Sequence, residues 1–192
     1  MKKLFALFLI VSINPIFANT KDTLRIYTLE EALKANPENV YAITLERMKL
    51  ETVPAELARF KNLKKLDLSK NKLTELPDFI GGFDSLQELD LHKNKFFIFP
   101  LQICRLGNLQ KLIASRNEFT QIPECVQYLK KLNYIDLSDT PVGNFPEAFV
   151  IMPQLKTLSL HGLSYPPSFQ LRWKERLPWM RIEFDPPCHC LE

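Results

Sequence analysis

The chain has 192 residues, with 25 Lys and Arg against 22 Asp and Glu and a formal net charge of +3. Two of the lysines lie in the first 18 residues, so the remainder carries 23 basic and 22 acidic residues and is nearly neutral. This balance argues against nucleic acid as the main partner. No apolar run in the sequence is long enough to span a membrane as a helix.

The first 18 residues have the pattern of a secretory signal peptide. Two lysines precede an apolar run over residues 4–13, and the small residue Ala18 marks the expected cleavage site. The first cysteine is Cys104, far from that site, which argues against a lipid anchor. We therefore expect a secreted or periplasmic protein with a signal peptide at 1–18 and a leader at 19–27.

A single domain is expected from residue 28 to residue 192, and it begins with a helical cap over 28–39. Thr28 and Glu31 have the spacing of a capping box, in which each side chain bonds to the other's backbone N–H. Pro37 stops the helix after about Asn36. Because the end of a repeat stack exposes an apolar cross-section, this helix is interpreted as a cap rather than a docking element.

A 23-residue unit is then repeated through 40–163. Its clearest copy begins at Leu63 (LKKLDLSKNKLTELPDFIGGFDS), and the same spacing returns from Leu86, Leu109 and Leu132. The period lies within the range of leucine-rich repeats. Leucines alternate with polar residues early in each unit, as in a half-buried strand. Stacked units are therefore expected to form a parallel sheet and one continuous core.

Asn71, Asn94 and Asn117 fall where the chain turns inward after each expected strand. A buried amide there can satisfy backbone donors and acceptors of neighbouring turns. We therefore predict a structural ladder of asparagines, which is broken in the unit from Leu132 because Thr140 stands at that position.

A second cap is expected at 164–192. The sequence predicts that Ser168 caps a helix over 169–176 and that a terminal strand runs from about Met180 to Phe184. Two tryptophans are expected to close this end of the core: Trp173 and Trp179.

The 23-residue unit, with proline after its fourth frame residue, resembles the Ras-group type of leucine-rich repeat. The leader, the segment TLEEALKANPENVY, the repeats and the ending KERLPWMRIEF are together similar to small exported bacterial proteins of this class. The resemblance covers about residues 27–185. It implies an α/β repeat solenoid, an arc with a parallel sheet on its concave face, closed by an N-terminal helix and a C-terminal helix and strand. It also implies binding of a protein or other ligand without catalysis, and it transfers no fixed set of site residues.

Candidate binding residues come from aligning the outward strand positions into columns on the concave face. Beyond the columns of Asp90 and His92, seven cations follow one rim: Arg47, Lys49, Lys70, Lys72, Lys93, Lys95 and Arg116. One interpretation is an electrostatic site for an extended acidic partner or glycan, whose field raises association rates. The other is a solvated surface whose charges neutralise each other. The candidates from these columns are Lys70, Asp90, His92, Lys93 and Arg116.

Apolar residues interrupt this polar pattern at two places. Ile113 breaks the aspartate column, and Tyr134 is expected on the next strand, one pair closer to its start. Phe97 and Ile98 replace polar pairs of the other units. Aromatic and apolar anchors dominate interface energies, so both pairs are candidate contacts, although scattered exposed apolar residues are normal.

Catalysis is not expected. His92 lies between Ser69 and Ser115 on adjacent strands with Asp90 nearby, so a hydrolase triad can be imagined. The face offers no glycine-rich turn or helix N-terminus for an oxyanion hole, and His161 is three strands, roughly 14 Å, away. We therefore expect no enzyme activity and no cofactor.

The four cysteines are divided into two pairs. Cys104 and Cys125 lie at non-equivalent positions of adjacent units and are interpreted as small filling residues rather than a bridge. Cys188 and Cys190 flank His189, and three adjacent ligands cannot close a tetrahedral metal shell, so no metal is expected. Export favours disulfides and leaves open a link from these two cysteines to another chain.

Two functional hypotheses follow. The favoured one is a non-catalytic, monomeric recognition module that binds a protein or surface glycan through the concave face and ascending loops. The alternative is a structural component of the cell envelope whose repeat surface self-associates.

Overall fold

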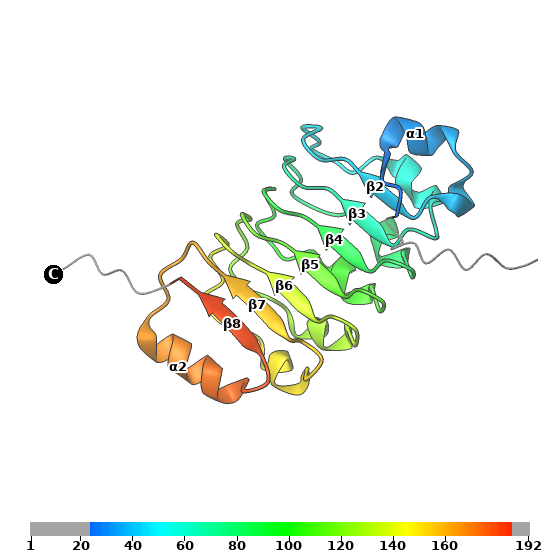
Figure 1. The fold of residues 1–192 in the computed structure, drawn as a ribbon. Coiled ribbons are helices and arrows are strands. Elements are labelled where there is room, and N and C mark those ends of the chain that lie inside the picture. The colour runs from blue at the N-terminus through cyan, green and yellow to red at the C-terminus, as the bar shows by residue number, and fades with distance from the viewer. Residues whose placement is uncertain (1–23, 186–192) are drawn as a thin grey trace, which may run out of the picture.

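The computed structural model describes residues 24–185. These residues form one sheet of eight parallel strands in chain order, coiled into the expected leucine-rich repeat arc (Figure 1). The strands are β1 (Tyr27–Thr28), β2 (Ala42–Thr44), β3 (Lys65–Asp67), β4 (Glu88–Asp90), β5 (Lys111–Ile113), β6 (Tyr134–Asp136), β7 (Thr157–Leu160) and β8 (Arg181–Phe184).

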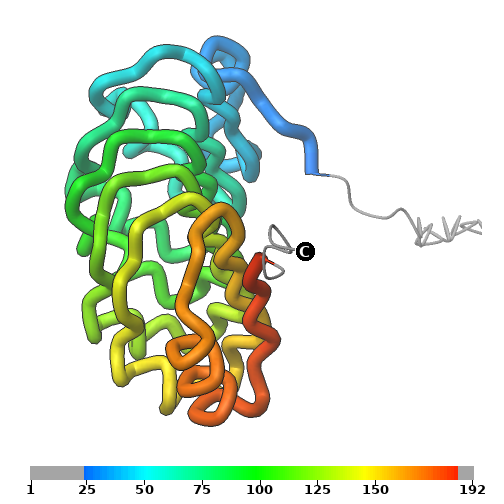
Figure 2. Tube along the Cα trace, turned by 90° about the vertical axis from the view of Figure 1, so that its left-hand side faces the viewer, coloured from blue at the N-terminus to red at the C-terminus, as the bar shows by residue number. Residues whose placement is uncertain are grey.

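The strand register follows the 23-residue period. Leu66 pairs with Leu89, and Leu89 with Leu112, so equivalent leucines stack in a row that is buried beneath the sheet. The residues on either side of each leucine point to the concave face because side chains alternate along a strand. Figure 2 shows the turns of the chain stacked as successive coils of one solenoid.

Short 3-10 turns form the convex side. Each of five such turns begins directly after a proline, which fixes φ and has no N–H that needs a partner. They are η2 (Ala55–Arg59), η3 (Asp78–Gly82), η4 (Leu101–Arg105), η5 (Glu124–Tyr128) and η6 (Glu147–Ile151). The proline in each unit therefore sets the point at which the chain turns onto the convex side.

The asparagine ladder is confirmed. Asn94 is 7% exposed; its Oδ1 accepts from the Leu73 N–H at 3.0 Å, and its Nδ2 donates to the Leu68 and Leu91 carbonyls at 3.0 Å each. The asparagines of the units on either side bond in the same way. The side chains thus link backbone groups of neighbouring turns.

Thr140 extends the ladder instead of breaking it. Its hydroxyl is fully buried, accepts from the Asn117 N–H at 3.3 Å and donates to the Ala114 carbonyl at 3.1 Å. A hydroxyl has both a donor and acceptor lone pairs, so threonine performs part of the asparagine's role.

The residue before each ladder position has a left-handed backbone. Five non-glycine residues there have φ between 55° and 60°: Arg47, Lys70, Lys93, Arg116 and Asp139. Gly162 completes the series with φ of 86°, and a Cβ at that position would collide with the Asp139 carboxylate. Four of the seven rim cations therefore lie where the repeat imposes an unfavourable backbone conformation, which costs about 1–2 kcal/mol per residue.

The N-terminal cap contains α1 (Leu29–Lys34) and the short turn η1 (Pro37–Asn39). The predicted capping box is confirmed: the Thr28 N–H donates to Glu31 Oε2 at 2.9 Å, and the Glu31 N–H donates to Thr28 Oγ1 at 3.3 Å. The helix ends two residues earlier than expected because Asn36 caps η1. The strand β1, which the sequence analysis missed, adds one more pair to the sheet.

The C-terminal cap contains α2 (Pro167–Arg176) and β8. The predicted cap at Ser168 is wrong, because the helix already begins at Pro167, and proline suits the first turn of a helix. The terminal strand starts within one residue of its expected position. Trp173 is buried with its ring centroid 5.1 Å from that of Phe145, while Trp179 is half-buried, so both contribute to closing the core.

A disulfide joins Cys104 to Cys125, with 5.6 Å between their Cα atoms. The interpretation of these cysteines as separate filling residues is therefore wrong. The turns η4 and η5 lie side by side on the convex face, so positions 21 rather than 23 residues apart still come within bridging distance. The other two cysteines, Cys188 and Cys190, lie outside the described residues.

Candidate binding surface

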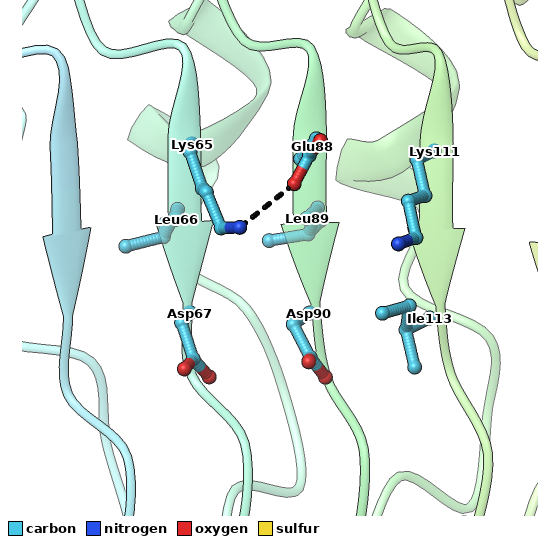
Figure 3. A pocket seen from close by; sticks show the side chains of 8 residues that line it. All are labelled: Lys65, Leu66, Asp67, Glu88, Leu89, Asp90, Lys111 and Ile113. Carbon is cyan, nitrogen blue, oxygen red and sulfur yellow. Dashed lines mark ion pairs between the residues drawn. The ribbon is translucent and has the colours of Figure 1, made fainter. Parts of the chain in front are cut away.

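The expected columns of the concave face are present. Asp67 pairs with Asp90, Asp90 with Ile113, and Ile113 with Asp136 along the sheet. A cavity of about 110 Å³ opens between β3, β4 and β5 (Figure 3). Its lining combines the Ile113 side chain and charged side chains with the backbone of two buried leucines: Lys65, Leu66, Asp67, Glu88, Leu89, Asp90, Lys111 and Ile113.

The aspartates in this column differ in how their oxygens are used. Each accepts from the backbone N–H two residues further on. The second oxygen of Asp67 accepts from Thr44 at 3.2 Å, and that of Asp136 accepts from Ser115 at 3.0 Å. Asp90 Oδ2 has no such donor among residues 24–185, so it remains available at the cavity.

Burial raises the pKa of Asp90 to about 6. The nearby charges of Asp67 and Asp136 act in the same direction, while the His92 N–H and Lys111 act against it. Burial and neighbouring negative charges destabilise the ionised form of this carboxylate. A positively charged ligand group placed beside it would stabilise that form.

His92, Ser115 and Asp136 form a hydrogen-bond chain in that order. This order differs from that of a Ser-His-Asp catalytic triad. His92 Nδ1 lies 2.9 Å from Ser115 Oγ, and the Ser115 hydroxyl donates to Asp136 Oδ2 at 3.0 Å. The serine therefore stands between histidine and carboxylate, and its proton points away from the imidazole. A catalytic triad needs the histidine in the middle position, where it can take the serine proton.

The pKa of His92 is lowered by burial and by the positive charges of Arg116 and Lys70. A neutral imidazole with its Nδ1 proton donated to Ser115 fits this environment. We conclude that His92 helps order the side chains of the concave face.

The cationic rim is only partly neutralised. Lys70 pairs with Glu46 at 2.8 Å, and Arg116 pairs with Asp139 at 3.0 Å. Lys93, by contrast, has no ion pair to another residue of 24–185. Of the three cations predicted as contacts, Lys93 is therefore the one whose charge is most available to a partner.

Ile113 and Tyr134 are both half-buried on the concave face. They are not direct strand partners, because Ile113 pairs with Asp136 while Tyr134 pairs with Lys111. The Lys111 ammonium lies 5.4 Å from the centroid of the Tyr134 ring, and burial raises the pKa of the Tyr134 hydroxyl. The two apolar residues are thus diagonal neighbours with charged groups around them.

Phe97 and Ile98 lie away from this face, on the side of the solenoid. They are 71% and 74% exposed, and Leu101 beside them is 61% exposed. Sequence reasoning missed Leu101, although it stands where Asp78 and Glu124 stand in the neighbouring units. The predicted site residues therefore form two separate surfaces.

Two further hollows lie at the ends of the sheet. One of about 510 Å³ is lined by residues of α2, β8 and the turn at His161, and one of about 440 Å³ lies beside α1. Within residues 24–185, no group of three or more His, Cys, Asp or Glu side chains is arranged to hold a metal ion. None of the helices in that range is long and apolar enough to cross a membrane.

The geometry defines a leucine-rich repeat solenoid, and comparisons with known proteins agree with that fold. Residues 38–96 match the family model described as leucine rich repeat. Among solved structures, the chain is similar to a plant peptide hormone receptor, RGFR1, in complex with RGF2, with 27% identity and a TM-score of 0.54. The match covers 64% of this chain and 21% of the receptor chain, so this chain spans about a fifth of the receptor's length. A search of curated proteins finds no match.

Proposed function

We propose that this protein is an exported, non-catalytic recognition module that binds an extended segment of a protein partner on its concave face. The observation that carries the proposal is the cavity at β3–β5, where the Ile113 side chain and the free oxygen of Asp90 lie together. A concave pocket in which an apolar side chain lies next to placed polar groups is the arrangement expected of a ligand site.

The chemistry of this cavity favours a segment with one basic and one apolar residue. A lysine or arginine of the partner would reach Asp90 and Asp67, because Lys65 is paired with Glu88 at 3.0 Å and neither aspartate has an ion pair within residues 24–185. An apolar side chain next to it would pack against Ile113 and Tyr134. The similar solved structure is a peptide hormone receptor in complex with RGF2, which supports a peptide as the class of ligand.

Export is part of the proposal. The signal-like residues 1–18 lie outside the described range, and the supporting observation within it is the bridge between Cys104 and Cys125. Disulfides persist in oxidising compartments and are rare in the cytosol. N-terminal sequencing of the expressed protein should find Asn19 or a nearby residue first, and an intact Met1 in a cytosolic fraction would contradict export.

Selection from a random-peptide display library on the immobilised protein tests the site directly. Selected peptides should carry a basic residue next to an apolar one. Tyr134→Ala should weaken their binding by about 1–3 kcal/mol through lost burial, mostly as faster dissociation. Asp90→Asn should remove the preference for the basic residue, because the amide carries no charge.

The matched control is Tyr128→Ala, which removes a tyrosine that is 64% exposed on the convex turn η5. It should leave peptide affinity unchanged. Peptides that bind Tyr134→Ala and Asp90→Asn as tightly as the unchanged protein would place recognition elsewhere. Binding of glycans with no selectable peptide would overturn the assignment of a protein ligand.

A further inference from the structure

We infer, on the basis of the proposed function, that the concave cavity takes up a basic residue of its ligand in exchange for a proton on Asp90. The site therefore holds a peptide at neutral pH and releases it in mildly acidic surroundings. The coupling depends on a single carboxylate, whose neighbours on the adjacent strands favour the exchange.

The repeat places one carboxylate directly beside another at this point. Asp67 and Asp90 are partners in the register of β3 and β4, so their backbones are about 4.8 Å apart. Figure 3 shows both side chains at the same end of their strands. In the strand pair before this one, Thr44 is the register partner of Asp67, and its hydroxyl donates to that carboxylate at 3.2 Å. Asp67 cannot donate to Asp90 in this way while it is ionised, so the two negative charges repel each other.

The basic side chains of the cavity contact other partners. Lys65 pairs with Glu88 at 3.0 Å (Figure 3), and the Lys111 ammonium lies 5.4 Å from the centroid of the Tyr134 ring. Asp90 has no ion pair with any residue in the range 24–185. A cationic group of a ligand would therefore be its first direct ion-pair partner.

The surroundings of Asp90 make its protonation easy. Burial is the largest influence on this carboxyl and raises its pKa to about 6, and the charges of Asp67 and Asp136 act in the same direction. The His92 N–H and the Lys111 ammonium oppose this rise without cancelling it. Burial also lowers the pKa of the His92 imidazole, so at neutral pH this side chain adds no positive charge that would replace a ligand cation.

A ligand cation and a proton compete for the same carboxylate. Asp90 Oδ1 accepts from the His92 N–H at 2.8 Å, whereas Oδ2 remains available at the cavity. A proton on Asp90 removes the charge that attracts a lysine or arginine, and a bound lysine or arginine favours loss of that proton to the solvent. Ligand binding therefore lowers the pKa of Asp90, and by linkage the affinity rises as pH increases through about 6.

The size of the effect follows from the fraction of the protein in which Asp90 is ionised. The apparent Kd equals the intrinsic Kd divided by this competent fraction. With a pKa of about 6, the ionised fraction is close to one at pH 7.5 and about one tenth at pH 5. We therefore expect an approximately tenfold loss of affinity between these two pH values.

Isothermal titration calorimetry with a peptide selected on the protein at pH 7.5 tests this inference. The peptide is chosen to lack Asp, Glu, His and Cys and has blocked ends, so that it does not itself titrate between pH 5 and pH 7.5. Its Kd should rise about tenfold from pH 7.5 to pH 5, and binding at pH 6 should release about half a proton. The matched control is the same peptide with glutamine in place of its basic residue, which should bind more weakly and without pH dependence.

Three variants separate the carboxylates. Asp90→Asn should make the Kd of the peptide independent of pH in this range, because no proton remains to be exchanged. Asp67→Asn should move the midpoint of the pH dependence to a lower pH, because Asp90 loses a neighbouring negative charge. Asp84→Asn removes an exposed carboxylate that does not line the cavity, and it should keep both the midpoint and the tenfold change.

A carbon-13 NMR titration of the Asp90 carboxyl carbon, assigned by its absence in Asp90→Asn, tests the same site without a peptide. We expect a midpoint of about 6, and a midpoint near the ordinary aspartate value of about 4 would overturn the inference. Equal Kd values at pH 5 and pH 7.5 for a peptide that Asp90→Asn weakens would also overturn it, while leaving the proposed function intact. Failure to select any peptide at pH 7.5 would overturn the proposed function and the pH coupling together.

Discussion

Replacing Asn94 by alanine tests how much of the stability of this fold depends on its asparagine ladder. The side chain makes three hydrogen bonds to buried backbone groups. Two of these have a substitute, because the Leu68 carbonyl keeps Asn71 as a donor and the Leu91 carbonyl keeps Asn117. The third partner, the Leu73 N–H, is left without an acceptor.

The expected loss of stability follows from that single orphaned group. A buried N–H without an acceptor costs about 1–3 kcal/mol. With a urea m-value of about 2 kcal/mol/M for a domain of this size, the midpoint of unfolding should fall by about 1 M. Lys130→Ala, which removes an exposed side chain, should cost under about 0.5 kcal/mol.

Asn94→Thr provides a graded variant, because Thr140 already occupies the equivalent position two units later. Its hydroxyl keeps one donor and one acceptor, so its urea midpoint should lie between those of the unchanged protein and Asn94→Ala. Equal midpoints for Asn94→Ala and Lys130→Ala, measured by circular dichroism, would refute the reasoning that the ladder stabilises the stack.

Three further predictions concern the disulfide, the rim and the buried carboxylate. Cys104→Ser should lower stability by about 2–4 kcal/mol by releasing a loop of some twenty residues, and non-reducing mass spectrometry should find Cys104 and Cys125 in one linked fragment. Gly162→Ala should cost about 1–3 kcal/mol, because Gly162 has a φ of 86° that residues with a side chain rarely adopt and its Cβ would also displace the Asp139 carboxylate. Gly107→Ala adds an atom with nothing within 4 Å and should be nearly neutral; equal thermal midpoints for the two variants would contradict this. The raised pKa of Asp90 means that the folded state holds its proton more tightly than the unfolded state. Its contribution to stability should therefore fall as pH rises from about 4 to 6, and Asp90→Asn should remove that part of the pH dependence in urea titrations at each pH.

Much of this fold could be predicted because the same 23-residue spacing recurs in each repeat. The recurring leucines fix the strand positions, and Asn94 with its equivalents fixes the inward turns, so the register of the sheet follows from counting. The capping box at Thr28 is equally local, since both partners lie within one helical turn. Such features depend on spacing along the chain, which a single sequence contains.

Other features depend on distances between non-equivalent positions. Cys104 and Cys125 are 21 residues apart, which differs from the 23-residue period, so they do not occupy equivalent positions. They come together because the turns η4 and η5 lie side by side. The order of His92, Ser115 and Asp136 in their hydrogen-bond chain likewise depends on side-chain rotamers across two strand pairs. Alignment alone places these residues near each other without saying which donates to which.

The candidate site was predicted in outline but not in its chemistry. The columns locate Asp90 and Ile113 on one face, yet they do not reveal that Asp90 alone among the column's aspartates lacks a donor to its second oxygen within residues 24–185. Leu101 shows the opposite case. It could have been found from the sequence, because it replaces an acidic position in the adjacent units, but its place beside Phe97 required the loop geometry.

The central claim is that the concave face binds a protein partner. Site-specific photo-crosslinking in cultures of the producing cells tests this claim most directly. A photo-reactive amino acid at Ile113 would lie on the concave face beside the cavity, and the same group at Tyr128 would lie on the convex side. The account predicts a discrete protein adduct from position 113, whose yield falls in Tyr134→Ala, and none from position 128. Identical adducts from both positions, or an adduct from position 113 with the same yield in Tyr134→Ala, would contradict recognition on the concave face.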